Sequence, residues 1–553
     1  MRRLPDVLWV VLWGLLSTGW ILSASPELSA TFDEPFYLRS SLKSWRTGSN
    51  FELMKAGTMP LPVDVEYLPV YLWEQVRGQP FDEEKEFHRL LQIGRTGNLV
   101  FWWVLLVYGF RVANLYGGAW AGRLGVVLLA TEPSLLGHAC LATTDIAITA
   151  AMLLFTFHYQ TGRTRGWFRR WFLPGVLYGV AMTAKASALT FVPIVMFALE
   201  IPRWRVNRIW SPPVGVGRIP HVWNQVRPLW ADFWKMLLVA TVVLWGYCGC
   251  DWVVLPSGVK WAENLQDETW GPPMRWLTRN AKIFPNAGQG VVYQIKHNIR
   301  GHGAYLLGEW YPRAVRHYFP VALSIKLTLP VLGLFLLLLA QPRSLATPLT
   351  LIVLGLFLFA FNIRVQIGIR LIFPFVVFFL LMLGVGFART SEKWKSGLRW
   401  SVLLLFSGLA AVPPLQVWPD GLRYANELWG GPDRVHLYLS DSNSDWGQGV
   451  TELDRWTEER GLPLCRVWYY GMDPKIADDP NRLLPLHHNG IYPAEKPEDF
   501  AKYVRGHIVA VGKSILLGDP LITPSMPTAL EFIRKQQPMA ETRSFVIYDF
   551  RAP

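Results

Sequence analysis

The stretch QIGIRLIFPFVVFFLLMLGVGFA, residues 366–388, decides the fold class. Arg370, near its start, is its only charged residue, and the eighteen residues that follow carry no charge. An α-helix of that length crosses roughly 30 Å of hydrocarbon, because each residue adds about 1.5 Å along the axis. Residues 366–388 therefore predict a membrane-spanning helix.

Other blocks along the chain share this apolar, nearly charge-free character. They lie near residues 7–23, 98–116, 119–137, 141–160, 171–185, 187–200, 234–255, 319–340, 346–362 and 398–418. The 553 residues are 51% hydrophobic and only 17% charged, which is too apolar for an ordinary soluble domain. We expect a polytopic α-helical membrane protein of about eleven spans. The short blocks 171–185 and 187–200 form either two spans or one re-entrant element.

Basic residues predict the orientation of these spans. Arg and Lys crowd three short connections, at 163–170, 203–208 and 389–399. All three lie on the cytoplasmic side when the spans are threaded from a cytoplasmic N-terminus. Topology therefore explains the formal charge of +13, and we expect no nucleic-acid partner. The first block also fits a signal peptide, but we expect a retained anchor because more spans follow.

This threading divides the chain into two predicted domains. Residues 1–418 form a transmembrane domain with outward loops 24–97 and 255–318, and residues 419–553 form an extracytoplasmic α/β domain. Strand-like runs lie at 435–440, 465–470, 507–511 and 544–550, and an amphipathic helix at 450–459. The strand, helix, strand order predicts a βαβ unit. The chain has no Walker loop, which argues against an ATP-driven pump.

Acidic residues beside predicted spans are the first candidates for chemistry. Asp33 and Glu34 lie a few residues beyond the first block, where a carboxylate suits removal of a proton from an acceptor hydroxyl or amine. Side chains alternate in an extended stretch, so we expect one of the pair, Asp33, to face the reacting centre. Asp145, which precedes a span, is expected to line the same cavity. The alternatives are a solvated pair and a helix cap, respectively.

Basic residues at the outward ends of spans are the second group. Lys185 lies between two apolar runs and Arg370 begins its span, where charge is a functional candidate and a snorkelling anchor is the alternative. Loop 255–318 carries eight Lys or Arg residues against four Asp or Glu residues. Its Arg300, Arg313 and Arg316 are candidates for binding a lipid phosphate, because guanidinium groups pair with phosphate oxygens.

The string DSNSDWGQ, residues 441–448, follows a predicted strand and precedes a predicted helix. Ligands commonly bind at that junction of an α/β sheet, and Asn443 and Asp445 suit hydrogen bonds to a sugar. A turn rich in Asn and Asp that caps the helix is the alternative. No Cys-rich or His-rich pattern indicates a structural metal.

Together these strings resemble the GT-C superfamily, specifically the dolichyl-phosphate-mannose protein mannosyltransferase family and its bacterial relatives, which include the lipid A aminoarabinose transferase. The likeness rests on Asp33-Glu34, residues 138–145, Lys185, GIRLIFP at 368–374, YANELWGGP at 424–432 and residues 442–448. It implies a glycosyltransferase of the bacterial inner membrane that faces the periplasm, uses a polyprenyl-phosphate sugar donor and glycosylates a protein or a lipid. It also implies Asp33 as the catalytic acid group and a phosphate clamp drawn from Lys185, Arg370 and the basic loop.

Our mechanistic hypothesis is inverting displacement with Asp33 as general base. It requires no cofactor, and a divalent metal is allowed without being indicated. Relatives carry His or Lys before Pro-Pro-Leu in the first loop, whereas this chain reads TMPLP at 58–62, so Lys55 is the residue that would compensate. The other readings are a polytopic transporter and a non-catalytic sugar-lipid binding protein. A transporter would place its polar site near the bilayer midplane between related halves, and this chain shows no repeated halves.

Overall fold

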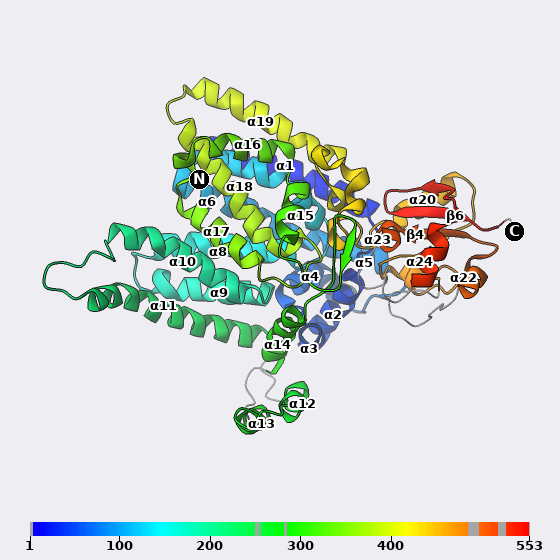
Figure 1. Ribbon diagram of the computed structural model, residues 1–553, viewed down its shortest axis with the longest axis horizontal. Helices are drawn as coiled ribbons and strands as arrows, with labels where there is room; N and C mark the ends of the chain where they lie inside the picture. The colour runs from blue at the N-terminus through cyan, green and yellow to red at the C-terminus, as the bar shows by residue number, and fades with distance from the viewer. Residues whose placement is uncertain are drawn as a thin grey trace.

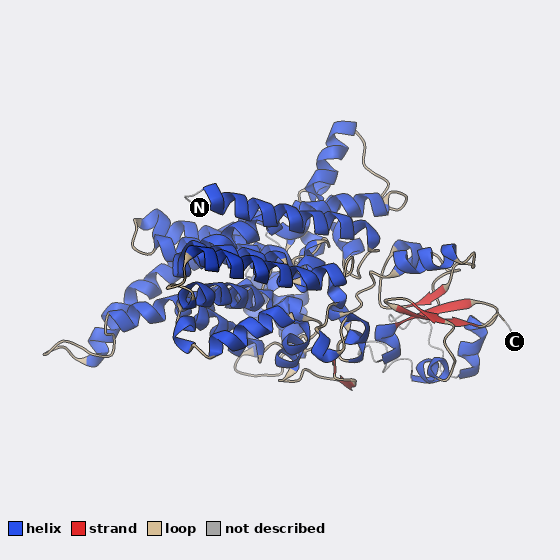
Figure 2. Cartoon of the chain, turned by 90° about the horizontal axis from the view of Figure 1, so that it is seen from above, coloured by secondary structure: helices blue, strands red, loops and turns tan. Residues whose placement is uncertain are grey.

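The computed structural model describes residues 4–248, 254, 256–280, 285–484, 497–517 and 527–551. Long helices run side by side along the long axis of the molecule, and a small sheet lies at one end, near the C-terminus (Figure 1). A view from above shows the same separation of the helical bundle from the strands (Figure 2). The last residues of the predicted block 234–255 lie outside the described residues.

The apolar stretch at 371–388 forms the centre of the bundle. Helix α18 (Phe373–Thr390) follows the 3-10 turn η4 (Ile369–Ile372), and every residue of α18 up to Ala388 is buried. It packs against α6 (Leu99–Ala130), α8 (Asp145–Gly162), α16 (Leu329–Leu339) and α17 (Pro348–Ala360). A helix that is apolar on every side is stable only when other apolar elements or lipid surround it.

The bundle contains further helices. They are α1 (Leu4–Ala24), α9 (Leu173–Ala184), α10 (Ala188–Val206), α11 (Arg218–Tyr247), α15 (Tyr318–Lys326) and α19 (Ser396–Gln416). Five helical stretches of the described residues are long and apolar enough to cross a membrane, or six if α15 and α16, bent by 111°, form one span. The chain is an integral membrane protein, and the count of eleven spans stays a prediction.

The predicted spans 98–116 and 119–137 are two helices that share the label α6 and fold back on each other, since a Cβ on Gly109 would lie 2.4 Å from Leu129. Blocks 98–116 and 119–137 meet inside α6 at Gly118, whose φ of 69° is open to glycine at little cost. The second helix ends at Ala130, before the predicted bound of 137, and the short α7 (Pro133–Ala139) follows. The sequence pattern placed the break correctly, because Gly117 and Gly118 interrupt the apolar run there.

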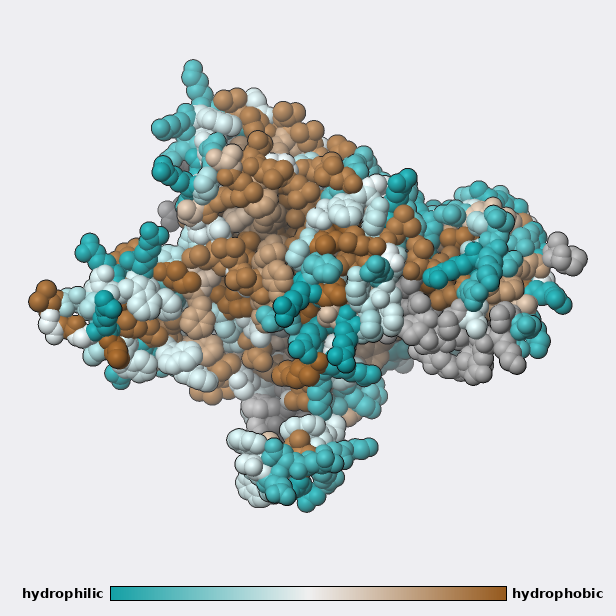
Figure 3. Space-filling model, in the orientation of Figure 1, coloured by the Kyte–Doolittle hydropathy of each residue, from teal (hydrophilic) through white to brown (hydrophobic). Residues whose placement is uncertain are grey.

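The outward loops of the prediction are largely helical. Loop 24–97 contains α2 (Glu34–Thr47), α3 (Phe51–Lys55), α4 (Pro60–Arg77) and α5 (Phe87–Gly97). Loop 255–318 contains α12 (Pro256–Glu263), α13 (Gly271–Asn280), α14 (Pro285–Arg300) and the hairpin β1 (Ala304–Leu306) and β2 (Glu309–Tyr311). Apolar side chains cover much of the bundle, whereas the tail and the projecting α12 and α13 are mostly hydrophilic (Figure 3).

The tail contains a four-stranded sheet in the order β3-β4-β6-β5. Its strands are β3 (Arg466–Trp468), β4 (Ile508–Gly512), β5 (Ala540–Glu541) and β6 (Phe545–Asp549). Strands β3 and β4 are parallel, and β6 is antiparallel to β4 and β5. Three predicted strands are confirmed, and helix α20 (Val450–Glu459) has the predicted bounds.

The predicted strand at 435–440 is wrong. Residues Pro432–Leu437 form the 3-10 turn η7, and only Leu439 makes an isolated bridge, to Leu306. Gly430 and Gly431 both have positive φ, and Pro432 lacks an N–H group, so the chain turns here rather than extending. The alternation of apolar residues therefore belongs to an irregular segment, and residues 441–448 do not follow a strand of the sheet.

Candidate functional site

Four charged residues from distant parts of the chain meet at one end of the bundle, and we call them the charge cluster: Asp33, Asp145, Lys185 and Arg370. Arg370 Nη1 lies 3.7 Å from Asp33 Oδ2 and 3.6 Å from Asp145 Oδ2. Lys185 Nζ lies 2.5 Å from Asp145 Oδ1. Two cations thus face two carboxylates, with Asp145 contacting both cations.

Each member of the charge cluster stands where a helix begins or ends. Asp33 precedes α2 and Asp145 is the first residue of α8, so both carboxylates lie at helix N-termini, which favour negative charge. Lys185 ends α9 in an extended conformation, with φ −161° and ψ 137°. Arg370 belongs to η4, which leads into α18.

The charge cluster is closed on one side and open on the other. The Asp145 and Arg370 side chains are 0% and 9% exposed, whereas those of Asp33 and Lys185 are 29% and 24% exposed. Burial raises the pKa of Asp33 above its ordinary value, and the Arg370 guanidinium opposes that rise. Asp33 and Lys185 are therefore the members that an incoming molecule reaches first.

Arg370 keeps unused hydrogen-bonding capacity inside the site. Its guanidinium carbon lies 3.9 Å from the ring centroid of Trp446, a cation–π contact. Its Nε is buried and has no hydrogen-bond partner among the described residues. The His138 ring lies edge-on to Phe373 at 5.0 Å and 5.9 Å from the Trp446 ring. Since buried donors normally have acceptors, this unpaired donor is an exception inside the site.

Glu34 points away from Asp33 into a buried ion pair. Its carboxylate accepts from Arg95 Nε at 2.8 Å and from Nη2 at 2.7 Å, and both side chains are almost fully enclosed. It also accepts from the backbone N–H groups of Thr31 and Ala142. The two carboxylates diverge as expected, but not through an extended stretch, because Asp33 has helical φ and ψ and Glu34 begins α2. The contacts of Glu34 favour a structural role over the catalytic role for which it was a candidate.

The two predicted ligand residues of the tail are enclosed in the structure. Asn443 accepts from the Ile369 backbone N–H at 3.1 Å and donates to the Tyr318 hydroxyl at 2.9 Å. Asp445 accepts from the Gly447 N–H at 3.1 Å, and burial raises its pKa to about 7. Asn443 therefore supports the turn that carries Arg370, and neither side chain forms an ion pair with the charge cluster.

The remaining predicted phosphate ligands lie elsewhere on the surface. Lys55, Arg300, Arg313 and Arg316 are exposed, and among the described residues none of them pairs with a member of the charge cluster. The Lys55 ammonium lies 5.9 Å from the Phe51 ring. Within the described parts of the chain, no group of three or more His, Cys, Asp or Glu residues is arranged to hold a metal ion.

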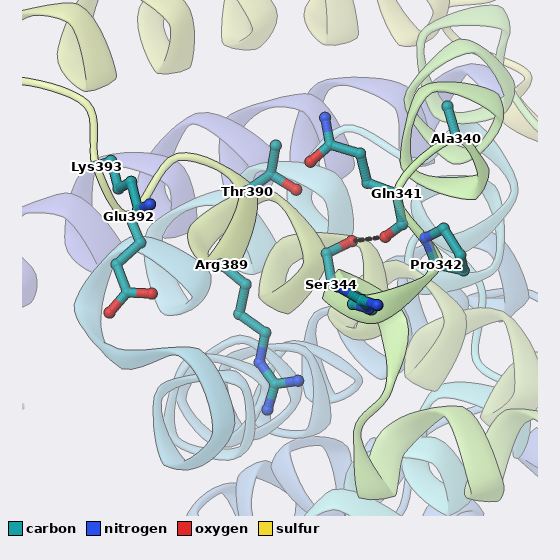
Figure 4. Close-up of a pocket in the computed structure, with 9 residues that line it drawn as sticks. Ala340, Gln341, Pro342, Ser344, Arg389, Thr390, Glu392 and Lys393 are labelled. Carbon is teal, nitrogen blue, oxygen red and sulfur yellow. Dashed lines mark hydrogen bonds between the residues drawn. The ribbon is translucent and has the colours of Figure 1, made fainter.

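A cavity of about 520 Å³ lies at the other end of α18 (Figure 4). It is bordered by the end of α16, by η3 (Pro342–Leu345) and by residues 389–393. The eighteen residues of α18 separate it from Arg370, which at about 1.5 Å per residue is roughly 27 Å. The basic connection 389–399 reaches this cavity, so it belongs to the predicted cytoplasmic face and not to the charge cluster.

The fold and the charge cluster define a polytopic helical membrane protein with a polar site at one end of its bundle. No family model and no curated protein matches the sequence. Among solved structures the chain is similar to ArnT from Cupriavidus metallidurans bound to undecaprenyl phosphate, with 13% identity, a TM-score of 0.48, and coverage of 98% of this chain and 97% of that one. It is also similar to the oligosaccharyltransferase AglB from Archaeoglobus fulgidus in complex with an inhibitory peptide and a dolichol-phosphate, with 12% identity, a TM-score of 0.43, and coverage of 99% and 74%.

Proposed function

We propose that this protein is a glycosyltransferase that moves a sugar from a polyprenyl-phosphate donor to a hydroxyl or amine group of a protein or lipid acceptor. The observation that carries the proposal is the charge cluster, in which an accessible carboxylate, Asp33, stands beside two cations at one end of a membrane bundle. A phosphate at headgroup level beside a base is the arrangement that this transfer needs.

The proposed reaction is a single displacement with inversion. Asp33 accepts the proton of the acceptor hydroxyl or amine while the acceptor atom bonds to the anomeric carbon. The bond between that carbon and the phosphate oxygen breaks, and its electron pair remains on the polyprenyl phosphate. A raised pKa makes the Asp33 carboxylate a stronger base than an ordinary aspartate.

The cations are proposed to bind the donor phosphate and to stabilise the charge that grows on it. Lys185 is accessible and the Arg370 guanidinium lies beside the same Asp145 carboxylate, so the two cations are proposed to act together on the phosphate oxygens. Asp145 contacts both cations and thereby fixes their spacing. The scheme requires no cofactor or metal, although it leaves room for a divalent cation.

The site is proposed to face the periplasm. The three basic connections lie away from the charge cluster in sequence, and the connection at 389–399 follows the opposite end of α18. On this view residues 1–418 form the catalytic membrane domain, and residues 419–553 form a domain outside the cytoplasm that borders the site.

Reconstituted protein with an undecaprenyl-phosphate-linked sugar tests the proposal. We expect Asp33→Asn to lower the transfer rate at least about a hundredfold, as loss of a general base does, with donor binding retained. Asp82→Asn is the matched control, because Asp82 lies in the same predicted loop, is 45% exposed and contacts only its own turn, through the Glu84 N–H and the Lys85 ammonium. Equal rates for Asp33→Asn and the parent would refute the assignment of the base. Sugar-lipid uptake without transfer would identify a transporter, and binding without turnover a sugar-lipid binding protein.

A further inference from the structure

One short segment of the tail contacts both halves of the charge cluster. Residues 441–448 lie between the loop that carries Asp33 and the turn that carries Arg370, and they are buried throughout. Trp446 is 1% exposed, although it is the largest side chain of the segment. The tail therefore reaches into the site and does not merely follow it in sequence.

The first half of the segment holds the turn before Arg370. Ser442 Oγ donates to the Ile367 carbonyl at 2.5 Å, and Ile369 N–H donates to Asn443 Oδ1 at 3.1 Å. Gly368 adopts φ +147°, and a Cβ there would lie 2.2 Å from Ser442 Oγ. Only glycine therefore fits between these hydrogen bonds.

Asn443 is itself held firmly in place. The Lys326 ammonium donates to the Asn443 carbonyl at 2.7 Å, and the Asn443 amide donates to the Tyr318 hydroxyl at 2.9 Å. Both partners come from α15, a helix of the bundle. The turn that carries Arg370 is thus connected through the tail to a second membrane element.

The second half of the segment holds Arg370 and the Asp33 loop together. The Trp446 ring lies 3.9 Å from the Arg370 guanidinium carbon. The carbonyl of the same residue accepts from the Phe32 N–H at 2.9 Å, one residue before Asp33. Ser29 N–H donates to the Gln448 carbonyl at 3.1 Å, and Ser29 Oγ to the Gly447 carbonyl at 3.0 Å.

We infer that Trp446 is a positioning residue of the site: its ring holds Arg370 and its backbone holds the Asp33 loop, so it sets the separation of the two groups. The inference rests on the proposed function for its catalytic meaning, but its structural content is independent of any ligand. A cation–π contact in a desolvated setting shifts an equilibrium by more than about tenfold toward the state that contains it. The contact is therefore strong enough to select one rotamer of Arg370.

The experiment compares three variants of the full chain in nanodiscs: Trp446→Leu, Trp446→Phe and Trp468→Leu. Trp468 is the matched control, since it is a buried tryptophan of the same tail, in β3, whose ring packs against Phe500. We expect hydrogen exchange at residues 29–33 and 366–371 to accelerate in Trp446→Leu, less in Trp446→Phe, and not in Trp468→Leu. The dissociation constant for undecaprenyl phosphate should rise about tenfold in Trp446→Leu.

Fluorinated tryptophans introduced at position 446 alone separate electrostatics from packing. Each added fluorine weakens the negative face of the ring while nearly preserving its shape, so undecaprenyl phosphate affinity should fall stepwise with fluorine number. The inference is overturned if affinity does not change across the fluorinated series. It is also overturned if hydrogen exchange is unchanged in Trp446→Leu, or if Trp468→Leu changes it equally. If the parent binds no undecaprenyl phosphate, the proposed function fails, and the exchange data still decide the role of Trp446.

Discussion

Removal of the Glu34 carboxylate distinguishes a structural residue from a catalytic one. Glu34 and Arg95 form a bidentate pair, with N–O distances of 2.8 and 2.7 Å, and their side chains are 0% and 1% exposed. Loss of one partner leaves an uncompensated buried charge, which costs about 3–5 kcal/mol. Glu34→Ala also removes the acceptor of the Thr31 and Ala142 N–H groups, each worth about 1–3 kcal/mol.

The order of the variants follows from these contacts. Glu34→Gln keeps an acceptor oxygen and should be less damaging than Glu34→Ala, and the double variant Glu34→Leu with Arg95→Met should lose less than the two single changes together. Recovery is incomplete, because Arg95 also donates to the carbonyls of Ser25, Leu28 and Ser29. These carbonyls stay buried and lose their donor in the double variant.

Thermal unfolding in detergent, followed by tryptophan fluorescence, measures the order. We expect Glu34→Gln to lower the Tm by several degrees and, while folded, to transfer sugar within a few-fold of the parent rate. Asp33→Asn should show the opposite pattern, with the Tm retained and transfer lost. If Glu34→Gln is as stable as the parent but inactive, Glu34 takes part in the chemistry and the structural interpretation of the Arg95 pair is refuted.

Two further predictions concern a buried acid and a strained glycine. Burial raises the pKa of Asp64 to about 7, above its value in the unfolded chain, so the folded state binds the proton more tightly. The free energy of unfolding should therefore fall as the pH rises from about 4 to 7. Asp64→Asn removes this titration, so the Tm of the variant relative to that of the parent should be higher at high pH than at low pH. A difference in Tm that does not change with pH contradicts this prediction. Gly368→Ala should weaken undecaprenyl phosphate binding about tenfold or more, because the new Cβ would lie 2.2 Å from Ser442 Oγ. Gly397→Ala is the control: Gly397 has open space around it, so this variant should bind as the parent does.

Sequence patterns predicted those parts of the fold that depend on chain length and polarity. Residues 371–388 have the length and composition of a buried span, and α20 has a clear apolar stripe, so both elements were predictable. The alternation of spans placed Lys185 and Arg370 at the same face of the membrane, because both residues lie at the outward ends of predicted spans. These inferences require only the periodicity of one segment or the alternation of spans.

Lateral contacts were beyond that reasoning. Helix α8 is buried on nearly all of its faces, so its periodicity does not reveal the rotation that turns Asp145 toward Lys185 and Arg370. No local pattern in 441–448 indicates that Trp446 lies beneath Arg370, because the contact joins a tail segment to a span. Glu34 illustrates the same limit, since its partner Arg95 lies in another helix of the loop and looks like an ordinary exposed base in the sequence.

The packing around α18 is a stronger argument against a transporter than the number of spans is. A transporter needs polar groups or space near the middle of the bundle, where its site lies. The middle of α18 instead touches α6 directly: a Cβ on Gly384 would lie 2.8 Å from the Ala121 carbonyl, and a Cβ on Gly125 would lie 3.0 Å from Leu381. Leu380 and Leu381 beside this contact are fully buried. Because even a methyl group does not fit between α6 and α18 there, the contact of these two helices leaves no room for a polar site.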